Sequence, residues 1–224
     1  MKALRVYQKL ADKELSGADL AKRALAKEEL VPILVDGMGQ KKAETKYGCA
    51  KALRIIADER PELLYPHFET FAGMLDNPNN IFQWEGIYLL AGLAGVDEEN
   101  KIDGILDSFF AKIEGPLMIT AANIIKGAAQ IVAARPHLGS RIVAEILRAE
   151  HGHYETPECY EIVCGTALKA FAKIYKWVPD PQPMLQFAQR HQRSSRAATR
   201  AAAEKLLARH ERASTREQKA AINV

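Results

Sequence analysis

The sequence lacks the long apolar runs, the paired cysteines and the apolar N-terminal region that mark membrane and secreted proteins. Its longest apolar run, Leu89 to Val96, is far too short to span a bilayer. Lys9, Asp12 and Lys13 interrupt the N-terminal stretch, so we expect no signal peptide. The 3 cysteines are an odd count without a secretory signal, which favours reduced thiols. These features predict a cytoplasmic protein without a membrane partner.

Signals for β-structure and for several kinds of catalytic site are also missing. No sustained alternation of polar and apolar residues occurs, and no Asn-Gly or Asp-Gly turn lies between β-branched runs. The glycine-rich stretch 91–95 falls within a predicted helix and lacks the Lys-Ser/Thr of a phosphate loop. Local sequence suggests no Ser/His/Asp or Cys/His arrangement, although such groups can assemble in space.

One segment, "EHGHYETPECYEIVC" at residues 150–164, gathers potential metal ligands: His151, His153, Cys159 and Cys164. Zinc-binding cysteines usually lie closer in sequence, and on a helix the Cys-x4-Cys spacing places the two sulfurs more than one turn apart. Cys164 also falls at a small, buried position of the repeat described next, a role that free cysteine commonly fills. We therefore expect no metal and no cofactor, and interpret residues 150–156 as a lengthened loop.

A pattern of small and apolar residues recurs through the chain. Segments aligned at Lys46, Gln83, Ala121, Glu161 and Thr199 carry such residues at offsets 3, 4, 7 and 10, which trace one face of an α-helix. The steps between the segments are 37, 38, 40 and 38 residues. Offset 3 holds Cys49, Gly86, Ile124, Cys164 and Ala202; offset 7 holds Leu53, Leu90, Ala128, Leu168 and Leu206; offset 10 holds Ile56, Leu93, Ile131, Phe171 and, as the exception, Arg209.

Prolines in helix-entry positions divide each repeat into two helices, and Asn77 and Thr156 are N-cap candidates. The predicted first helices cover residues 28–38, 61–75, 99–112, 136–150 and 181–191. The predicted second helices cover 42–59, 78–95, 116–134, 157–177 and 194–211. Two short helices, 2–14 and 18–26, are expected to cover the first repeat.

The stretch "ELVPILVDGM…TKYGCAKALRIIA" resembles a HEAT repeat, whose first helix typically reads Leu-x-Pro-x-Leu and is kinked by the proline; Pro32 and Pro66 occupy this position. Asp76 matches the usual turn before the second helix. The resemblance implies an all-α fold: a right-handed α-α superhelix of about five helix pairs whose second helices line the concave side. The prediction is a single domain over residues 1–224, with cap helices at 1–27, repeats at 28–211 and a tail at 212–224 that either extends the final helix or is disordered.

The concave face follows from the register at 100° per residue, because offsets 2 and 5 point away from the buried stripe. This face carries few charges in its middle, where Ile81, Leu89 and Ile119 stand. It fits either a docked helix or peptide, or tight packing between neighbouring repeats. Trp84 and Tyr88 are the expected anchors, although Trp84 could equally lie in the core. The candidate partner-binding residues are Glu44, Tyr47, Lys51, Trp84, Glu85, Tyr88, Asn123, Lys126 and Thr166.

The C-terminal segment carries most of the positive charge. Residues 187–224 hold nine Lys or Arg and three Glu, a net charge of +6, in a chain whose formal net charge is +3. This segment is either a solvated helix or a contact for phosphate or an acidic partner. HEAT-like DNA glycosylases use concave aromatic, acidic and basic residues, but their motif does not match this sequence position by position. A nucleic-acid-binding protein of that group is therefore the alternative, with Arg193, Arg196 and Arg200 as its contacts.

The pattern as a whole predicts a non-enzymatic scaffold or adaptor that binds a protein or peptide partner, which includes a second copy of itself, on the concave face. Iron-binding HEAT-like enzymes carry repeated His-Glu dipeptides, whereas only His210-Glu211 occurs here. No catalytic residue is expected.

Overall fold

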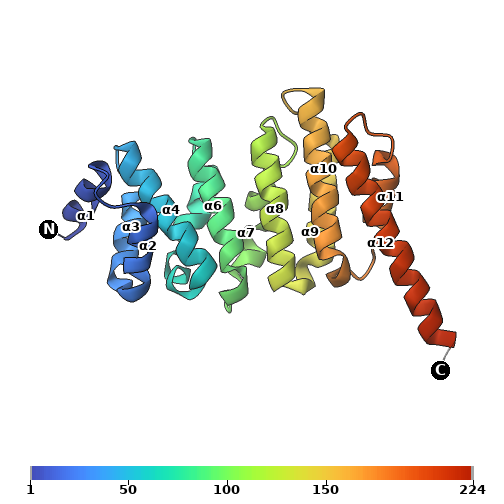
Figure 1. Ribbon diagram of the computed structural model, residues 1–224, viewed down its shortest axis with the longest axis horizontal. Coiled ribbons are helices and arrows are strands. Elements are labelled where there is room, and N and C mark those ends of the chain that lie inside the picture. Colours follow the sequence, from blue (N-terminus) through green and yellow to red (C-terminus); the bar gives the residue numbers. More distant parts are fainter. Residues whose placement is uncertain (1, 223–224) are drawn as a thin grey trace. The chain divides into compact units, whose positions relative to one another are not determined.

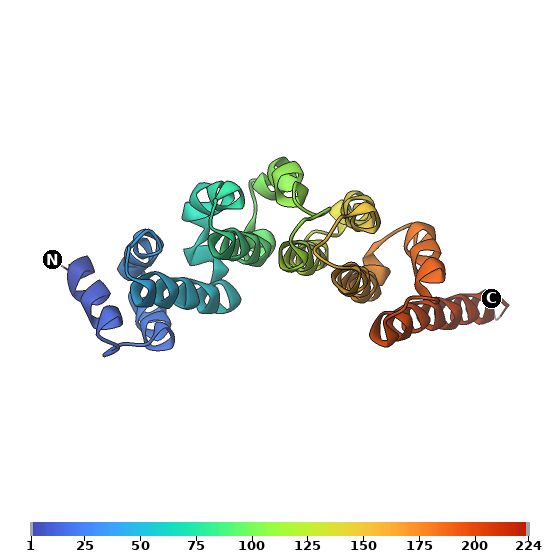
Figure 2. The ribbon, with the colours of Figure 1, turned by 90° about the horizontal axis from the view of Figure 1, so that it is seen from above.

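The computed structural model describes residues 2–222, and the regular elements in this range are all helical (Figure 1). The chain divides into two compact units, Met1–Ile105 and Leu106–Val224. In each unit the first helices of the pairs lie on one side and the second helices lie side by side on the other (Figure 2). The all-α solenoid class predicted from the repeat is confirmed, while the single domain over residues 1–224 stays a prediction.

The first unit begins with α1 (Lys2–Ala11) and α2 (Gly17–Ala26), which are followed by two helix pairs. The pairs are α3 (Val31–Gly37) with α4 (Ala43–Glu59), and α5 (Phe68–Gly73) with α6 (Asn80–Leu93). α2 packs closely along α4, since a Cβ added to Gly17 would lie 2.6 Å from the carbonyl oxygen of Gly48. The short 3-10 helices of this unit are η1 (Glu28–Leu30), η2 (Pro61–Leu63), η3 (Tyr65–His67), η4 (Met74–Asp76) and η5 (Ala94–Val96).

The second unit contains the remaining helix pairs, with α7 crossing its boundary. These helices are α7 (Lys101–Phe110), α8 (Met118–Ala134), α9 (Gly139–Leu147), α10 (Pro157–Ile174), α11 (Gln182–His191) and α12 (Ala197–Ile222). α10 packs between α8 and α12, while α9 and α11 cover it from the other side. The 3-10 helices are η6 (Pro136–Leu138), η7 (Arg148–His151) and η8 (Tyr175–Trp177).

The stripe predicted from the register forms the core of both units. The residues at offsets 7 and 10 are fully or almost fully buried, from Leu53 and Ile56 in α4 to Leu168 and Phe171 in α10. Arg209, the exception at offset 10, instead donates from Nη1 to the carbonyl oxygen of Ala172 at 2.5 Å. Burial of this continuous apolar stripe is the main stabilising contribution that the repeat supplies.

Three local predictions need correction. Asn79, not Asn77, caps α6: its Oδ1 accepts from the amide of Ile81 at 3.0 Å, while Asn77 accepts from the amide of Asn79. The first helix expected at 61–75 is not one kinked helix, because Pro61 and Pro66 lie in separate 3-10 helices before α5, whereas Pro32 lies in the first turn of α3. The last helix extends beyond the predicted end at 211, because α12 continues to Ile222; this is one of the two alternatives left open for the tail, of which residues 223–224 lie outside the described range. Thr156 does cap α10, accepting from the amide of Cys159 at 3.1 Å.

Candidate partner-binding surfaces

A polar network joins α4 to α6 in the middle of the predicted groove of the first unit. Arg54 donates from Nε to Glu85 at 2.5 Å and from Nη2 to the other oxygen of Glu85 at 2.9 Å. The guanidinium carbon lies 4.8 Å from the centre of the Tyr88 ring. The Tyr88 hydroxyl donates to the carboxylate of Asp58 at 2.7 Å. Burial, aided by this hydrogen bond to Asp58, raises the pKa of Tyr88 to about 12, so the phenol stays protonated at neutral pH.

The network corrects the expected exposure of offset 2. Glu85 is only 6% exposed and Val163, at the same offset in α10, is fully buried. Leu89, which was expected on the concave face, is also fully buried. Glu85 and Tyr88 contribute to packing between neighbouring second helices, one of the two alternatives that the sequence left open. Partner binding by either residue stays a prediction. The network residues that sequence reasoning missed, Arg54 and Asp58, lie in the last turns of α4, at offsets 8 and 12 of the register.

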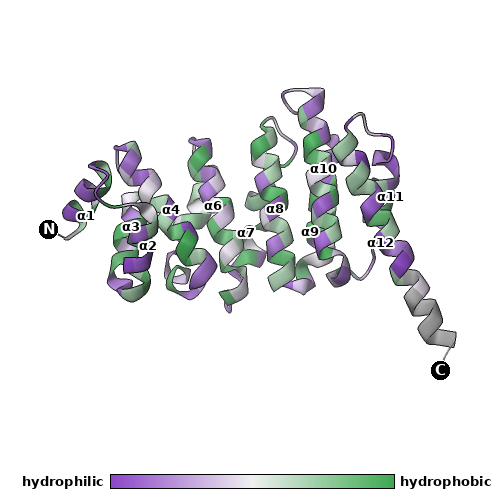
Figure 3. Cartoon of the chain, viewed as in Figure 1, coloured by the Kyte–Doolittle hydropathy of each residue, from purple (hydrophilic) through white to green (hydrophobic). Residues whose placement is uncertain are grey.

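An exposed aromatic patch lies at the beginning of α4 and α6; we call it the Tyr47 patch, and it consists of Lys46, Tyr47, Ile81 and Phe82. Tyr47 stacks on Phe82 with ring centres 6.4 Å apart, and Lys46 Nζ lies within 6 Å of both ring centres. Tyr47 is 36% exposed and Ile81 38% exposed, although both are large hydrophobic residues. The beginning of α6 accordingly carries a hydrophobic stretch in Figure 3. Among the described residues, Lys46 thus has two aromatic rings and no carboxylate as partners, and cation–π attraction holds its ammonium group over the rings.

The other candidates of the first unit differ in exposure. Glu44 and Lys51 are exposed on α4. Trp84 is half-buried on α6 and makes contacts of its own, so it is neither a fully buried core residue nor a freely exposed one.

The candidates of the second unit lie on α8 and α10. Lys126 is exposed and Asn123 half-buried on α8, where Ile119 is also 46% exposed. Thr166 is half-buried on α10, and its hydroxyl donates to the carbonyl oxygen of Ile162 in the same helix at 2.8 Å. This hydrogen bond within α10 uses the only hydrogen of the Thr166 hydroxyl, so the hydroxyl cannot donate to a partner while the bond is formed.

Two of the three arginines proposed for nucleic acid are engaged within the chain. Arg196 pairs with Glu158, with Nε 2.8 Å from the carboxylate oxygen. Arg200 donates from Nη1 to the carbonyl oxygens of Ser194 and Ser195 at 2.7 and 3.0 Å, and so fixes the turn before α12. Arg193 is exposed and has no such contact within the described residues. Nucleic-acid binding by these residues stays a prediction.

A loop is present but shorter than the expected 150–156, because Glu150 and His151 belong to η7; residues 152–156 form it and are tied to residues 113 and 114, which follow α7. The Tyr154 hydroxyl donates to the carbonyl oxygen of Ile113 at 2.6 Å, and the amide of His153 donates to that of Glu114 at 2.8 Å. Within residues 2–222 no group of three His, Cys, Asp or Glu side chains is arranged to hold a metal ion. All three cysteines are free, and burial raises the pKa of Cys49 and of Cys164 to about 12.

The α10–α11 junction contains a buried histidine that the sequence did not single out. His191 is 6% exposed, and its Nε2 lies 3.4 Å from Glu150, whose carboxylate accepts two hydrogen bonds from Arg190 at 2.8 and 2.7 Å. Burial lowers the pKa of His191, although the charges of Glu150 and Glu161 oppose the shift. Burial alone would raise the pKa of Glu150, but the hydrogen bonds and charge of Arg190 lower it overall. The arrangement therefore favours a neutral histidine beside an ionised carboxylate.

Comparison with known proteins identifies the fold but no relative in sequence. No family model matches the chain, and no curated protein matches it. Among solved structures, an engineered protein determined as a structural genomics target is similar at a TM-score of 0.57 and 16% identity, over 92% of this chain and 87% of that one. A designed armadillo repeat protein is similar at a TM-score of 0.57 and 14% identity, over 91% and 89%. No helix within residues 2–222 is both long and apolar enough to cross a bilayer. At this level of identity the likeness concerns architecture alone, and the chain has an all-α solenoid fold like that of armadillo and HEAT repeat proteins.

Proposed function

We propose that this chain is a non-enzymatic interaction module that binds a protein or peptide partner on the exposed faces of its second helices. In the first unit the anchor of the proposed site is the Tyr47 patch. The observation that carries the proposal is the exposure of Tyr47 and Ile81 beside the stacked Phe82 ring. Clustered exposed apolar side chains commonly mark contact sites, and tyrosine is enriched among the residues that dominate binding energy.

Side chains of the types that act in catalysis are either hydrogen-bonded within the fold or buried, and this supports a binding role. The Tyr88 hydroxyl and the Glu85 carboxylate are occupied by Asp58 and Arg54. The thiols of Cys49 and Cys164 are buried and remain protonated at neutral pH, whereas a nucleophilic cysteine must be a thiolate. Repeat proteins of this architecture present extended surfaces rather than deep pockets, which suits recognition of another polypeptide.

The test is site-specific photo-crosslinking in the source cells. A benzoylphenylalanine at position 47 keeps an aromatic ring in the patch, and the same group at exposed Thr70 on α5 is the matched control. We expect a discrete protein adduct from position 47, none of the same mass from position 70, and loss of the adduct when Ile81→Ser is added. Identical adducts from both positions, or an adduct unaffected by Ile81→Ser, would contradict the proposal.

A further inference from the structure

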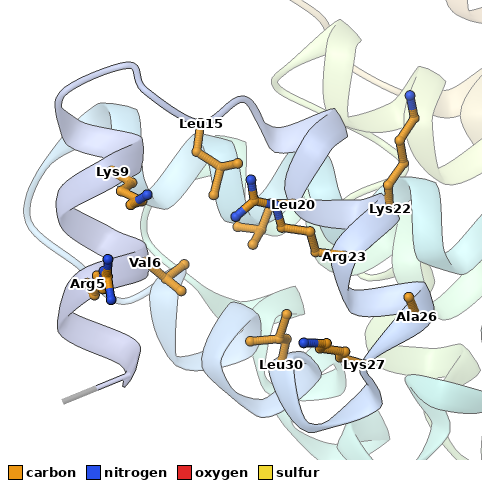
Figure 4. Close-up of a pocket in the computed structure, with 10 residues that line it drawn as sticks. All are labelled: Arg5, Val6, Lys9, Leu15, Leu20, Lys22, Arg23, Ala26, Lys27 and Leu30. Carbon is orange, nitrogen blue, oxygen red and sulfur yellow. The ribbon is translucent and has the colours of Figure 1, made fainter.

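A second surface of the first unit has features that the Tyr47 patch does not share. It is a groove of about 640 Å³ between α1, α2 and the beginning of the following segment (Figure 4). Five cationic side chains line it, and no acidic side chain does: Arg5 and Lys9 come from α1, Lys22 and Arg23 from α2, and Lys27 follows α2. Figure 4 shows the nitrogens of Lys9 and Lys27 directed toward the space between the helices, whereas Lys22 points away.

These five cations lack carboxylate partners, whereas six arginines elsewhere in the chain have them. Arg54, Arg60, Arg141, Arg148, Arg190 and Arg196 all form ion pairs within 4 Å. Within the described residues, none of the five groove cations does. Asp19, which is exposed on α2, bonds to Ser16 and interacts only at longer range with Lys22 and Arg23. Positive charge is thus concentrated around one groove, with Asp19 as the acidic group that acts on Lys22 and Arg23.

The floor of the groove is aliphatic. Leu15, Leu20 and Leu30 form its base but are each at least 94% buried, so the more accessible apolar side chains are half-buried Val6 and exposed Ala26. No hydroxyl, amide or aromatic side chain is present among the lining residues, so the groove offers charge and apolar contact but few directional hydrogen bonds. Small-molecule sites usually combine an enclosed cavity with several directional polar groups. The groove instead suits an extended amphipathic partner.

The shape of the groove favours a helix as that partner. α1 and α2 each contain 10 residues and are therefore about 15 Å long, which matches two to three turns of a third helix. A helix with leucine-type residues on one face and Asp or Glu on both flanks would meet the aliphatic floor and the cationic rims together.

We propose that this groove, which we call the N-terminal groove, binds an acidic amphipathic α-helix of a partner protein. The occupant is recognised by an apolar stripe on the floor and by acidic flanks against Arg5, Lys9, Arg23 and Lys27. This site goes beyond the Tyr47 patch and does not depend on it, because the two surfaces share no residue.

The experiment uses the full chain and a fluorescein-labelled synthetic helix of about 14 residues, with leucines spaced i, i+3, i+4 and i+7 and glutamates on both flanks. Fluorescence anisotropy should show saturable binding that weakens as salt rises. Arg5→Glu combined with Arg23→Glu should weaken binding about tenfold or more, because two attractions become repulsions. Both residues are exposed, and circular dichroism checks that the variant remains helical.

Three controls sharpen the result. Lys169→Glu with Lys173→Glu makes the same charge change at exposed positions of α10 and should leave binding unchanged. A peptide with lysines in place of the glutamates should bind the Arg5→Glu/Arg23→Glu variant better than the unaltered chain. Val6→Asn should weaken binding of the acidic peptide without a change of charge.

Several outcomes would overturn the proposal. One is equal binding of a peptide of the same composition whose leucines are scrambled, since charge alone would then explain the affinity. Another is an affinity insensitive to Arg5→Glu/Arg23→Glu. A third is groove-dependent binding to phosphatidylserine vesicles without any binding of the peptide, which would make the occupant a lipid surface. Loss of crosslinking at the Tyr47 patch would leave these measurements untouched, so the two proposals fail separately.

Discussion

The second helices α6 and α10 occupy the same place in the repeat, yet their polar groups bond to different neighbours: to the preceding segments in α6 and to the following segments in α10. In α6, Gln83 Nε2 donates to the carbonyl oxygen of Leu75 at 2.7 Å, and Glu85 accepts from Arg54 of α4. Both partners precede α6 in the chain. In α10, Glu161 accepts from the hydroxyl of Ser194, and its carbonyl oxygen accepts from Thr199 Oγ1 at 2.8 Å. Both of these partners follow α10.

The difference shows that the repeat specifies which face is buried but not which neighbour satisfies the polar groups. At offset 2 both helices bury their side chain, although one is Glu85 and the other Val163. Glu85 tolerates burial because a guanidinium binds it through two hydrogen bonds, whereas burial of an unpaired carboxylate is strongly unfavourable. Exchanging these two residues therefore tests the comparison directly.

The largest effect is expected for Val163→Glu. The side chain at this position is fully buried in α10, and Ala129 of α8 stands at the register position that Arg54 has in α4. A buried carboxylate without a partner should lower the free energy of unfolding by about 4 kcal/mol, or expel the helix from its packing. Urea titration followed by circular dichroism measures the loss.

Lys169→Glu is the control for this variant, because it places the same side chain on an exposed position of α10. A Val163→Glu protein as stable as Lys169→Glu would mean that position 163 is accessible, and the proposed equivalence with Glu85 would be lost.

Much of the fold was predictable, because periodicity and capping act locally. The apolar offsets identified the buried stripe, and helix-entry prolines with Thr156 placed most helix ends within a few residues. Which polar side chains pair with each other was not predictable in the same way. Glu85 and Arg54 are 31 residues apart, and only the packing of α4 on α6 brings them together. The N-terminal groove was missed for the same reason, since its five cations are ordinary surface residues in the sequence and form one surface only when α1 and α2 fold together.

A moderate effect is expected for Glu85→Val, which gives α6 the residue of α10. Arg54 loses two hydrogen bonds, but its side chain is 43% exposed and can be solvated by water. The free energy of unfolding should therefore fall by about 1–2 kcal/mol rather than by the larger cost of a fully buried charge. The double variant Arg54→Leu/Glu85→Val should recover most of this loss, because both polar groups are removed together. If the stability losses of the single variants Arg54→Leu and Glu85→Val instead add up in the double variant, the ion pair does not couple α4 to α6.

The smallest effect is expected at the junction of α10 with α11, where acid should act on His191. Burial lowers the pKa of this histidine, so the unfolded chain binds a proton more readily than the folded chain, and stability must decline as pH falls below about 6.5. Arg190, Glu150 and Glu161 are the charged groups that act on the ring, and Glu150, with a lowered pKa, stays ionised until more acidic conditions. Between pH 7.5 and 5.5 the melting temperature of the unaltered chain should therefore fall more than that of His191→Gln. His153→Gln, which removes an exposed histidine from the neighbouring loop, should behave like the unaltered chain. Parallel curves of melting temperature against pH for all three proteins would mean that His191 binds protons equally well in the folded and unfolded states. Acid would then not separate this junction, with its buried histidine, from the Arg54–Glu85 contact of the first unit.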